Sequence, residues 1–314
     1  MPSSSRAVRR PIPTEMPGWV IWLLGLELPE TNKRLVWITV LGAAVTVAAA
    51  ANTAPGRPLS VAGAWAITMA TVAIVCGAMG LQRLYRVGGI LINERNVMSL
   101  TRFQMTAWTI MIGSALLTIG MSRAFHPEVN GVTEALDIFV PDEVWQLLGI
   151  ASGSTVLSTM IKRNKERVEP NEKVIERTAT LIDGDDAKAV EENRVGILYG
   201  NSDARDARFM DMLEGDELAN AAFLDVGKVQ MFFFTVMSLL MYGTVLWVMM
   251  RGDSGMITRM PELTPAMVKI IGISHVAYLG TKFVPQTPTD PSGKTNATPP
   301  SEEKKENAEE APAK

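Results

Sequence analysis

The sequence predicts an all-α integral membrane protein with six transmembrane helices, a parallel internal repeat of two-helix units, a small cytoplasmic helical insert and a short β-hairpin. Three observations predict this fold class. Long uncharged runs alternate with charged loops, two short motifs recur in the same order, and mean hydropathy is positive although the chain carries 30 basic and 33 acidic residues. Charges gathered into blocks between apolar runs are typical of a membrane protein with polar loops.

The N-terminal segment, residues 1–34, is basic and contains an apolar run that is too short to cross a bilayer. That run, Gly18–Leu28, includes Glu27. A cleavable signal peptide is not expected, because no small-residue cleavage site follows the run. Trp19 and Trp22 favour the membrane–water interface, which predicts an interfacial helix.

Six charge-poor runs are long enough to be transmembrane helices. A bilayer core about 30 Å thick needs about 20 apolar helical residues. The fourth run is rich in Ser and Thr, which favours a buried helix over a lipid-facing one. The sixth contains Lys269, whose long side chain can reach the interface. The six runs are Leu35–Gly56, Pro58–Gln82, Phe103–Ser122, Val144–Ile161, Val229–Met250 and Leu263–Thr281.

Lysine and arginine are concentrated in alternate loops, and this predicts the orientation. The N-terminal segment, the loop between the second and third runs and the loop after the fourth run each carry four or more basic residues, whereas the other loops carry one or two. Because cytoplasmic loops are rich in Lys and Arg, both termini and the large loop are expected in the cytoplasm.

Two motifs recur in the second half of the chain. Arg102–Thr109 and Lys228–Thr235 share a basic residue, a Gln-Met pair and a Thr at an offset of 126 residues. Leu147–Ala151 matches Ile270–Ser274 at an offset of 123. Similar motifs at a nearly constant offset indicate a duplication. Each unit crosses the membrane twice, so the two units are expected to run parallel.

These features divide the chain into seven predicted segments. Apolar residues around a polar centre suggest the hairpin, and a C-terminal stretch rich in Pro, Thr, Glu, Lys and Ala suggests disorder. The segments are an N-terminal segment (1–34), helices one and two (35–82), a cytoplasmic loop with the hairpin (83–102), repeat unit one (103–161), the helical insert (162–227), repeat unit two (228–284) and a disordered tail (285–314).

The recurring polar residues at the starts of the repeat units are the first candidate functional positions. Arg102 and Lys228 are expected at the cytoplasmic mouth of a helix, where they anchor the helix or contact lipid phosphates. Gln104 and Gln230 lie two residues deeper, and an amide there needs a hydrogen-bond partner. A structural interhelical bond and the lining of a polar pore both remain open.

The second helix of each repeat unit supplies the other candidate positions. Gly149 and Gly153 form a small-xxx-small face, and Gly272 is the counterpart of Gly149; such faces let helices pack closely, or could line a path with hydroxyl neighbours. His275 is an ionisable residue inside a predicted span, which suggests either a proton or ligand role or a hydrogen-bonded structural role.

The sequence carries no recognisable catalytic motif. A single cysteine and two histidines argue against a disulfide framework and against a Cys or His metal cluster. No phosphate-binding GxxxxGK[ST] motif occurs. Ser274 and His275 are adjacent on a helix and point about 100° apart, which is unsuitable for a nucleophile and its base. We therefore expect no enzymatic activity, no cofactor and no nucleic-acid partner.

Two strings resemble uncharacterised bacterial multi-pass inner-membrane proteins with a duplicated two-helix unit. They are Ser99–Gln104, followed by a Trp-Thr helix start, and Gly215–Ala222, which precedes Lys228–Phe234. The similarity covers roughly residues 90–285. It implies a helical fold in a bacterial inner membrane and supplies no mechanism.

Two hypotheses for the function follow. The first is a non-enzymatic scaffold, anchor or sensor for a cytoplasmic protein partner. The alternative is an oligomeric channel or transporter for an ion or small solute. In either case the partners expected are the lipid bilayer and a second copy of the chain, with a cytoplasmic protein added in the first.

Overall fold

The protein is a multi-pass helical membrane protein. The computed structural model describes residues 32–53, 56–126, 134–182, 187–252 and 257–289, and this part of the chain contains helices and isolated bridges but no strand. Among the described residues, five helices are long and apolar enough to cross a membrane. They are α2 (Asn32–Ala51), α3 (Val61–Leu84), α4 (Leu100–Ala124), α5 (Asp142–Lys165) and α8 (Val226–Arg251). The prediction of an all-α membrane protein is confirmed at this level.

The sixth predicted run forms the shortest of the long helices, α9 (Pro265–Phe283), which contains Lys269 and Lys282 and is not among these five. It begins with a proline after Thr264, whose hydroxyl accepts a hydrogen bond from the backbone N–H of Met267, as expected of a helix N-terminus. α9 packs along α5 and α8. It therefore belongs to the bundle, although its composition does not place it among the five apolar helices.

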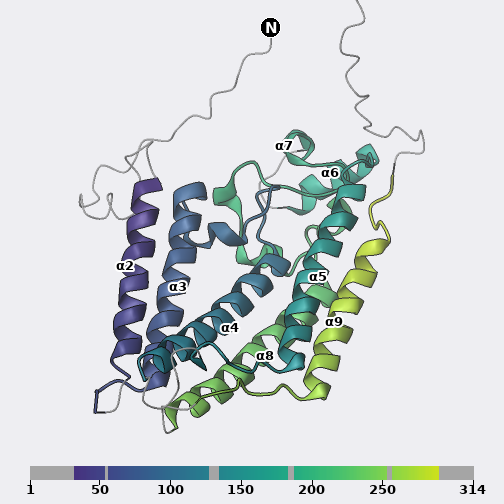
Figure 1. Cartoon of the computed structure of the whole chain (residues 1–314). Coiled ribbons are helices and arrows are strands. Elements are labelled where there is room, and N and C mark those ends of the chain that lie inside the picture. Colours follow the sequence, from purple (N-terminus) through teal and green to yellow (C-terminus); the bar gives the residue numbers. More distant parts are fainter. Residues whose placement is uncertain (1–31, 54–55, 127–133, 183–186, 253–256, 290–314) are drawn as a thin grey trace, which may run out of the picture.

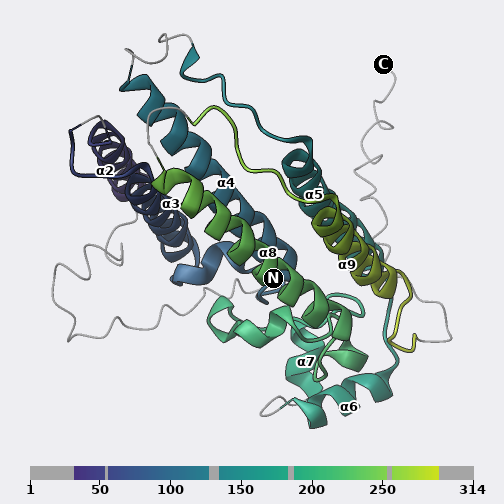
Figure 2. The ribbon, with the colours of Figure 1, turned by 90° about the horizontal axis from the view of Figure 1, so that it is seen from below.

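The six long helices are arranged in three layers, each made of two helices. Figures 1 and 2 show α2 and α3 on one side, α5 and α9 on the other, and α4 and α8 between them. The middle layer contacts both outer layers. Its helices run obliquely to the others (Figure 1).

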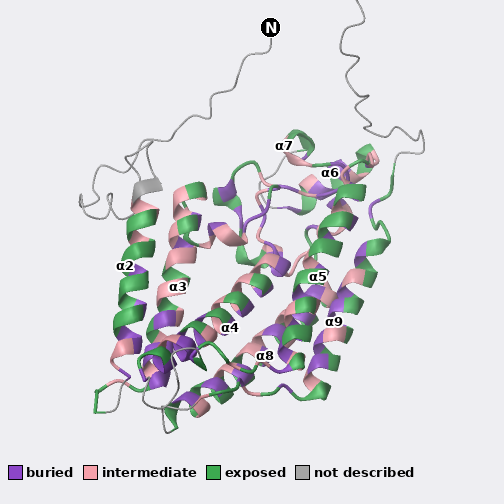
Figure 3. Ribbon diagram, viewed as in Figure 1, coloured by how far each residue is buried: buried purple, intermediate pink, exposed green. Residues whose placement is uncertain are grey.

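The bundle core is apolar and aromatic at the middle layer. The rings of Trp108 and Tyr242 lie 6.2 Å apart, and Trp65 donates a 2.9 Å hydrogen bond from Nε1 to Ser114 Oγ. The outer faces of the bundle expose apolar side chains, whereas a soluble protein buries most side chains of this kind. Figure 3 shows α2 exposed along most of its length, with Trp37 68% exposed. Exposed apolar side chains on long helices are suited to contact with lipid.

A compact polar segment lies between α5 and α8 at one end of the bundle. We call residues 166–225 the platform. It carries α6 (Glu172–Leu181), α7 (Ala187–Asn193) and, within the described residues, the short 3-10 helices η3 (Ala204–Asp206), η4 (Phe209–Met212) and η5 (Leu218–Asn220). Ile175, Val190 and Leu218 form a small apolar core of its own. The platform is the helical insert that the sequence predicts at 162–227.

The loop at 83–102 does not form the predicted hairpin. It contains a 3-10 helix, η1 (Val87–Leu91), and an isolated bridge between Ile92 and Met98. The reason is a close approach between two glycines: a Cβ atom on Gly80 would lie 2.7 Å from the backbone N of Gly89. η1 therefore packs onto α3 instead of pairing as a strand.

We expect Gly80→Ala to destabilise the protein by about 1–3 kcal/mol, because the added methyl group meets backbone atoms that cannot move aside. Gly113→Ala, in α4, is the matched control, since a Cβ there has nothing within 4 Å. Alanine is the better helix former, so the control should be neutral or slightly stabilising. Thermal unfolding in detergent measures both variants. Equal melting temperatures would contradict the close approach.

Two predicted segments fall largely outside the described residues. The interfacial helix at 18–28 does so completely, and so does the tail from residue 290 onward. The first residues of the predicted disordered tail are instead held in place. The backbone N–H groups of Gln286 and Thr287 both donate to Glu217 Oε2, and Asn171 N donates to the carbonyl of Pro288. The composition of the tail could not reveal these contacts, because residues distant in sequence, Glu217 and Asn171, supply them.

Candidate functional site

Two of the predicted site residues meet in the bundle interior. Gln104 of α4 is 2% exposed and His275 of α9 is 5% exposed, and their Nε2 atoms lie 3.5 Å apart. Gln104 Nε2 also donates to Thr235 Oγ1 of α8 at 2.5 Å. The Thr235 hydroxyl donates its own hydrogen to the carbonyl of Met231, so it is an acceptor for the amide. The sequence expectation of an interhelical bond at Gln104 is therefore met.

Some atoms of this polar cluster have no protein partner among the described residues. Gln104 Oε1 and His275 Nδ1 are buried and unpaired. The hydroxyls of Ser154 in α5 and Ser274 in α9 are also buried without a hydrogen-bond partner. Buried polar atoms without a partner usually bind water or a ligand, since leaving them bare is costly.

Gln230 does not share the position of Gln104. It is exposed on α8, and Met231 points inward instead. The inward-facing residues of α8 thus lie one residue further along than the sequence match indicates. A helix turns by about 100° per residue, so that shift moves Gln230 off the inner face. The two glutamines are not an equivalent pair, and the structure does not confirm the repeat.

Arg102 and Lys228 also differ in their surroundings. Arg102 donates to the carbonyl of Ile92 at 2.8 Å and pairs with Glu94 at 3.1 Å, and its side chain is 42% exposed. Lys228 is buried and contacts Asp216. Only the second of the two belongs to a buried charge cluster.

The three candidate glycines do not form a close helix contact within the described chain. Gly149 and Gly153 are exposed, and a Cβ added to either would meet nothing within 4 Å. Gly272 has only the side chain of Ile150 nearby, at 3.7 Å. The small-xxx-small face is therefore open.

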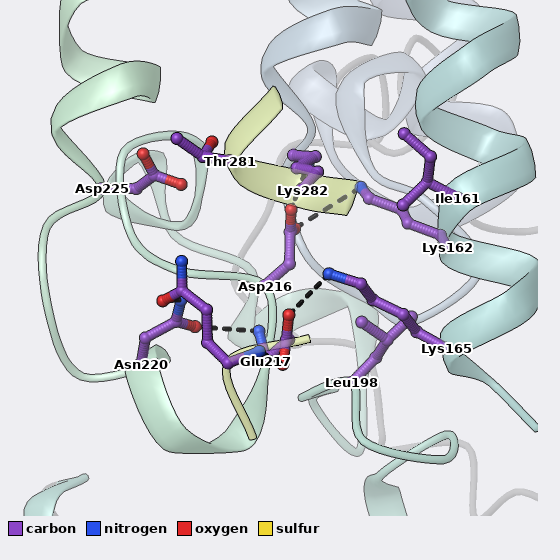
Figure 4. Close-up of a pocket in the computed structure, with 11 residues that line it drawn as sticks. Ile161, Lys162, Lys165, Leu198, Asp216, Glu217, Asn220, Asp225, Thr281 and Lys282 are labelled. Carbon is purple, nitrogen blue, oxygen red and sulfur yellow. Dashed lines mark hydrogen bonds and ion pairs between the residues drawn. The ribbon is translucent and has the colours of Figure 1, made fainter. Parts of the chain in front are cut away.

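The main cluster of charges surrounds Asp216, where the platform meets the bundle. We call Asp216 and its four described cationic neighbours the Asp216 junction. The Asp216 carboxylate forms ion pairs with basic side chains from three long helices and one loop, and Figure 4 shows part of this arrangement. The distances from its Oδ1 are 3.1 Å to Arg95, 3.4 Å to Lys162 of α5 and 3.3 Å to Lys228 of α8, and its Oδ2 pairs with Lys282 of α9.

A second buried pair lies next to the junction. Glu217 Oε1 accepts a 2.6 Å hydrogen bond from Lys165 Nζ, and the two side chains are 4% and 7% exposed. Its Oε2 accepts from the backbone N–H groups of Gln286 and Thr287, each at 2.8 Å. Glu217 therefore joins the end of α5 to the segment that follows α9.

A small cavity of about 20 Å³ lies between these two carboxylates and the helix ends. Lys162, Lys165 and Lys282 line it, and Figure 4 shows the side chains of Lys162 and Lys165 reaching Asp216 and Glu217. That volume is about the space that one water molecule occupies.

The electrostatic surroundings keep Asp216 ionised. Burial alone would raise the pKa of Asp216, but Lys162, Lys228, Lys282 and Arg95 hold that pKa well below its usual range. By contrast, burial raises the pKa of Asp211 in the same platform, although backbone N–H groups oppose the shift. The cation shell is thus the specific cause of the low pKa at Asp216.

The low pKa of Asp216 predicts how its stabilising effect depends on pH. A carboxylate with a lowered folded-state pKa stabilises the fold above the unfolded-state pKa, and this is lost as the pH falls through the folded-state value. We expect the difference in unfolding free energy between the wild type and Asp216→Asn to be largest above about pH 5 and to shrink below about pH 4. Thermal unfolding over this range measures the difference. A difference that grows on acidification would contradict the assignment.

The sequence predictions missed most of this cluster. Lys162 and Lys165 enter the sequence predictions only as basic residues of the loop after the fourth run, and Asp216 and Glu217 have no predicted role. One signal was present: an acidic pair lies between Leu213 and Leu218, in a segment whose apolar residues suggest burial.

The arrangement is suited to holding elements together and to attracting anions. Among the described residues, no group of three or more His, Cys, Asp and Glu side chains could hold a metal ion. Comparison with protein-family models, curated proteins and solved structures finds no match to this chain.

Proposed function

We propose that the protein is a non-enzymatic membrane scaffold or sensor, in which a helix bundle holds the platform in a defined position for a cytoplasmic protein partner. The observation that carries this proposal is the Asp216 junction. A single platform carboxylate contacts α5, α8, α9 and the loop before α4. A shift of any of these helices would change the charge contacts of the platform, as a sensor requires.

The orientation in this proposal follows from the basic residues at the platform end. Lys162, Lys228 and Lys282 all lie where a long helix meets the platform, and Arg95 joins them from the preceding loop. The positive-inside rule favours the cytoplasm for this end. We propose α9 as the sixth span, which places both termini on the same side, in a bacterial inner membrane as the resemblance implies.

Copurification of a partner tests the scaffold. The full-length protein is extracted in mild detergent and compared with a variant in which residues 164–223 are replaced by a flexible linker. We expect a stoichiometric protein that binds only the full chain. Capture of the same proteins by both forms would overturn the proposal.

A second candidate, a conduit for a small solute, has one specific observation in its favour. The unpaired Gln104 Oε1 and His275 Nδ1 lie in the bundle interior, where water or a small polar solute could bind. Flux through liposomes that contain the purified protein separates the candidates. Flux that Gln104→Leu abolishes and Gln230→Leu leaves unchanged would support the conduit, whereas sealed liposomes would support the scaffold.

A further inference from the structure

We propose that the cavity beside the Asp216 junction binds an oxygen atom of a phosphate-type anion. The four cations around Asp216 outnumber the carboxylate that they share, and Asp211 and Glu214 lie near only one of the four, Lys228. The side chains of Arg95, Lys162, Lys228 and Lys282 are only 2–14% exposed. Buried charge without enough counter-charge is costly, so a further anion stabilises this shell. A bound anion would stabilise the junction that holds the platform, and in this respect the inference rests on the proposed function. Anion binding itself needs no protein partner.

Lys162 is the cation whose hydrogen-bonding capacity is least used. Its ammonium group contacts Asp216 at 3.4 Å and has no hydrogen bond among the described residues. The other three cations have further partners: Arg95 and Lys228 donate to backbone carbonyls, and Lys282 lies 4.4 Å from the centre of an aromatic ring. An ammonium group has three donors, so Lys162 can donate to a ligand in the cavity that it lines.

Three carboxylates line the cavity, those of Asp216, Glu217 and Asp225, and all three are already engaged. Asp216 is shared by the four cations of the junction. Glu217 accepts from Lys165 and from two backbone N–H groups, and Asp225 Oδ1 accepts from the backbone N–H of Lys228 as the cap of α8. Figure 4 shows Asp225 on the far side of Asp216 from Lys162 and Lys165. The Lys162 side of the cavity is therefore its anion-attracting side.

The size and position of the cavity indicate the class of ligand. At about 20 Å³ it admits one oxygen atom, and the rest of a phosphate group would remain at its mouth. Lys162 and Lys282 end their helices, and Lys228 begins its own, at the level where the long helices leave the apolar layer. Lipid phosphates lie at this depth. A lipid headgroup and free phosphate offer the same oxygen chemistry.

Binding to the purified full-length protein tests this inference. Inorganic phosphate is titrated calorimetrically in a neutral detergent. In parallel, the protein is incubated with vesicles of phosphatidylcholine, with or without an equal part of phosphatidylglycerol, and the retained lipid is measured by native mass spectrometry. The variants are Lys162→Gln and the control Lys188→Gln, whose side chain is 83% exposed on α7. Lys162→Arg keeps the charge.

The outcomes are distinct. Phosphate affinity that Lys162→Gln weakens about tenfold or more, with no change for Lys188→Gln, supports the site with free phosphate as ligand. The same difference in retained phosphatidylglycerol alone supports a lipid headgroup. Equal binding by Lys162→Gln and Lys188→Gln overturns the inference. If Lys162→Gln aggregates, the wild type is compared with Lys162→Arg instead. Binding of phosphate or phosphatidylglycerol by both proteins supports the site. A wild type that binds neither phosphate nor phosphatidylglycerol overturns the inference.

Discussion

Asp216→Asn is expected to lower the free energy of unfolding by about 3–5 kcal/mol, or to prevent folding altogether. The substitution keeps the size of the side chain and removes its charge. Three buried cations, and Lys162 with its side chain 14% exposed, then remain without the carboxylate that they share. Removing one partner of a buried ion pair is strongly destabilising for this reason. Thermal unfolding in detergent, followed by size-exclusion chromatography, measures the loss.

Asp206→Asn is the matched control for Asp216→Asn. Asp206 belongs to the same platform but is exposed, and its Oδ2 lies 3.2 Å from Ser202 Oγ. Its substitution should change stability by less than about 0.5 kcal/mol. Equal melting temperatures for the two variants would show that Asp216 is not the centre of a buried junction.

A double variant tests the cause of the instability. If excess positive charge destabilises Asp216→Asn, then adding Lys162→Met should restore part of the loss, because it removes the cation with the fewest other partners. Residues in direct contact are expected to couple in this way. A double variant that is less stable than Asp216→Asn alone would assign the loss to something other than uncompensated charge.

The long helices could be predicted from the sequence because their signal is local. An uncharged run of about 20 residues needs little else to become a membrane helix. The face that each helix turns inward is harder to predict. Gln104 and Gln230 follow similar motifs, yet one is buried and the other exposed, because a shift of one residue rotates a side chain by about 100°. That rotation depends on the packing of neighbouring helices.

The Asp216 junction could not be predicted for a different reason. Lys162, Lys228 and Lys282 each lie at a helix end, where a basic residue is the ordinary consequence of the positive-inside rule. Their meeting on Asp216 requires the packing of α9 against α5 and α8, which brings together lysines up to 120 positions apart in sequence. The prediction of a hairpin at 83–102 was wrong for a similar reason, because the conformation of this loop depends on its contact with α3.

The second large effect is expected at the buried pair of Glu217 and Lys165, and it should be unequal between the two partners. Glu217→Ala leaves Lys165 buried without a counter-charge, and it also leaves the backbone N–H groups of Gln286 and Thr287 without their acceptor. We expect a loss of about 3–5 kcal/mol. Lys165→Met leaves a carboxylate that still accepts two backbone hydrogen bonds, so its loss should be smaller, about 1–3 kcal/mol.

Two measurements separate this explanation from a simple loss of an ion pair. Chemical unfolding gives the two stability losses, with the exposed pair of Lys188 and Glu192 as a control that should change by about 0.5 kcal/mol or less. Hydrogen exchange at Gln286 and Thr287 gives the local effect. Exchange there should rise in Glu217→Ala and stay nearly unchanged in Lys165→Met, because only the first variant removes the acceptor. Equal stability losses with equal exchange would mean that the charge pair, and not the double acceptor, holds the segment after α9 against the platform.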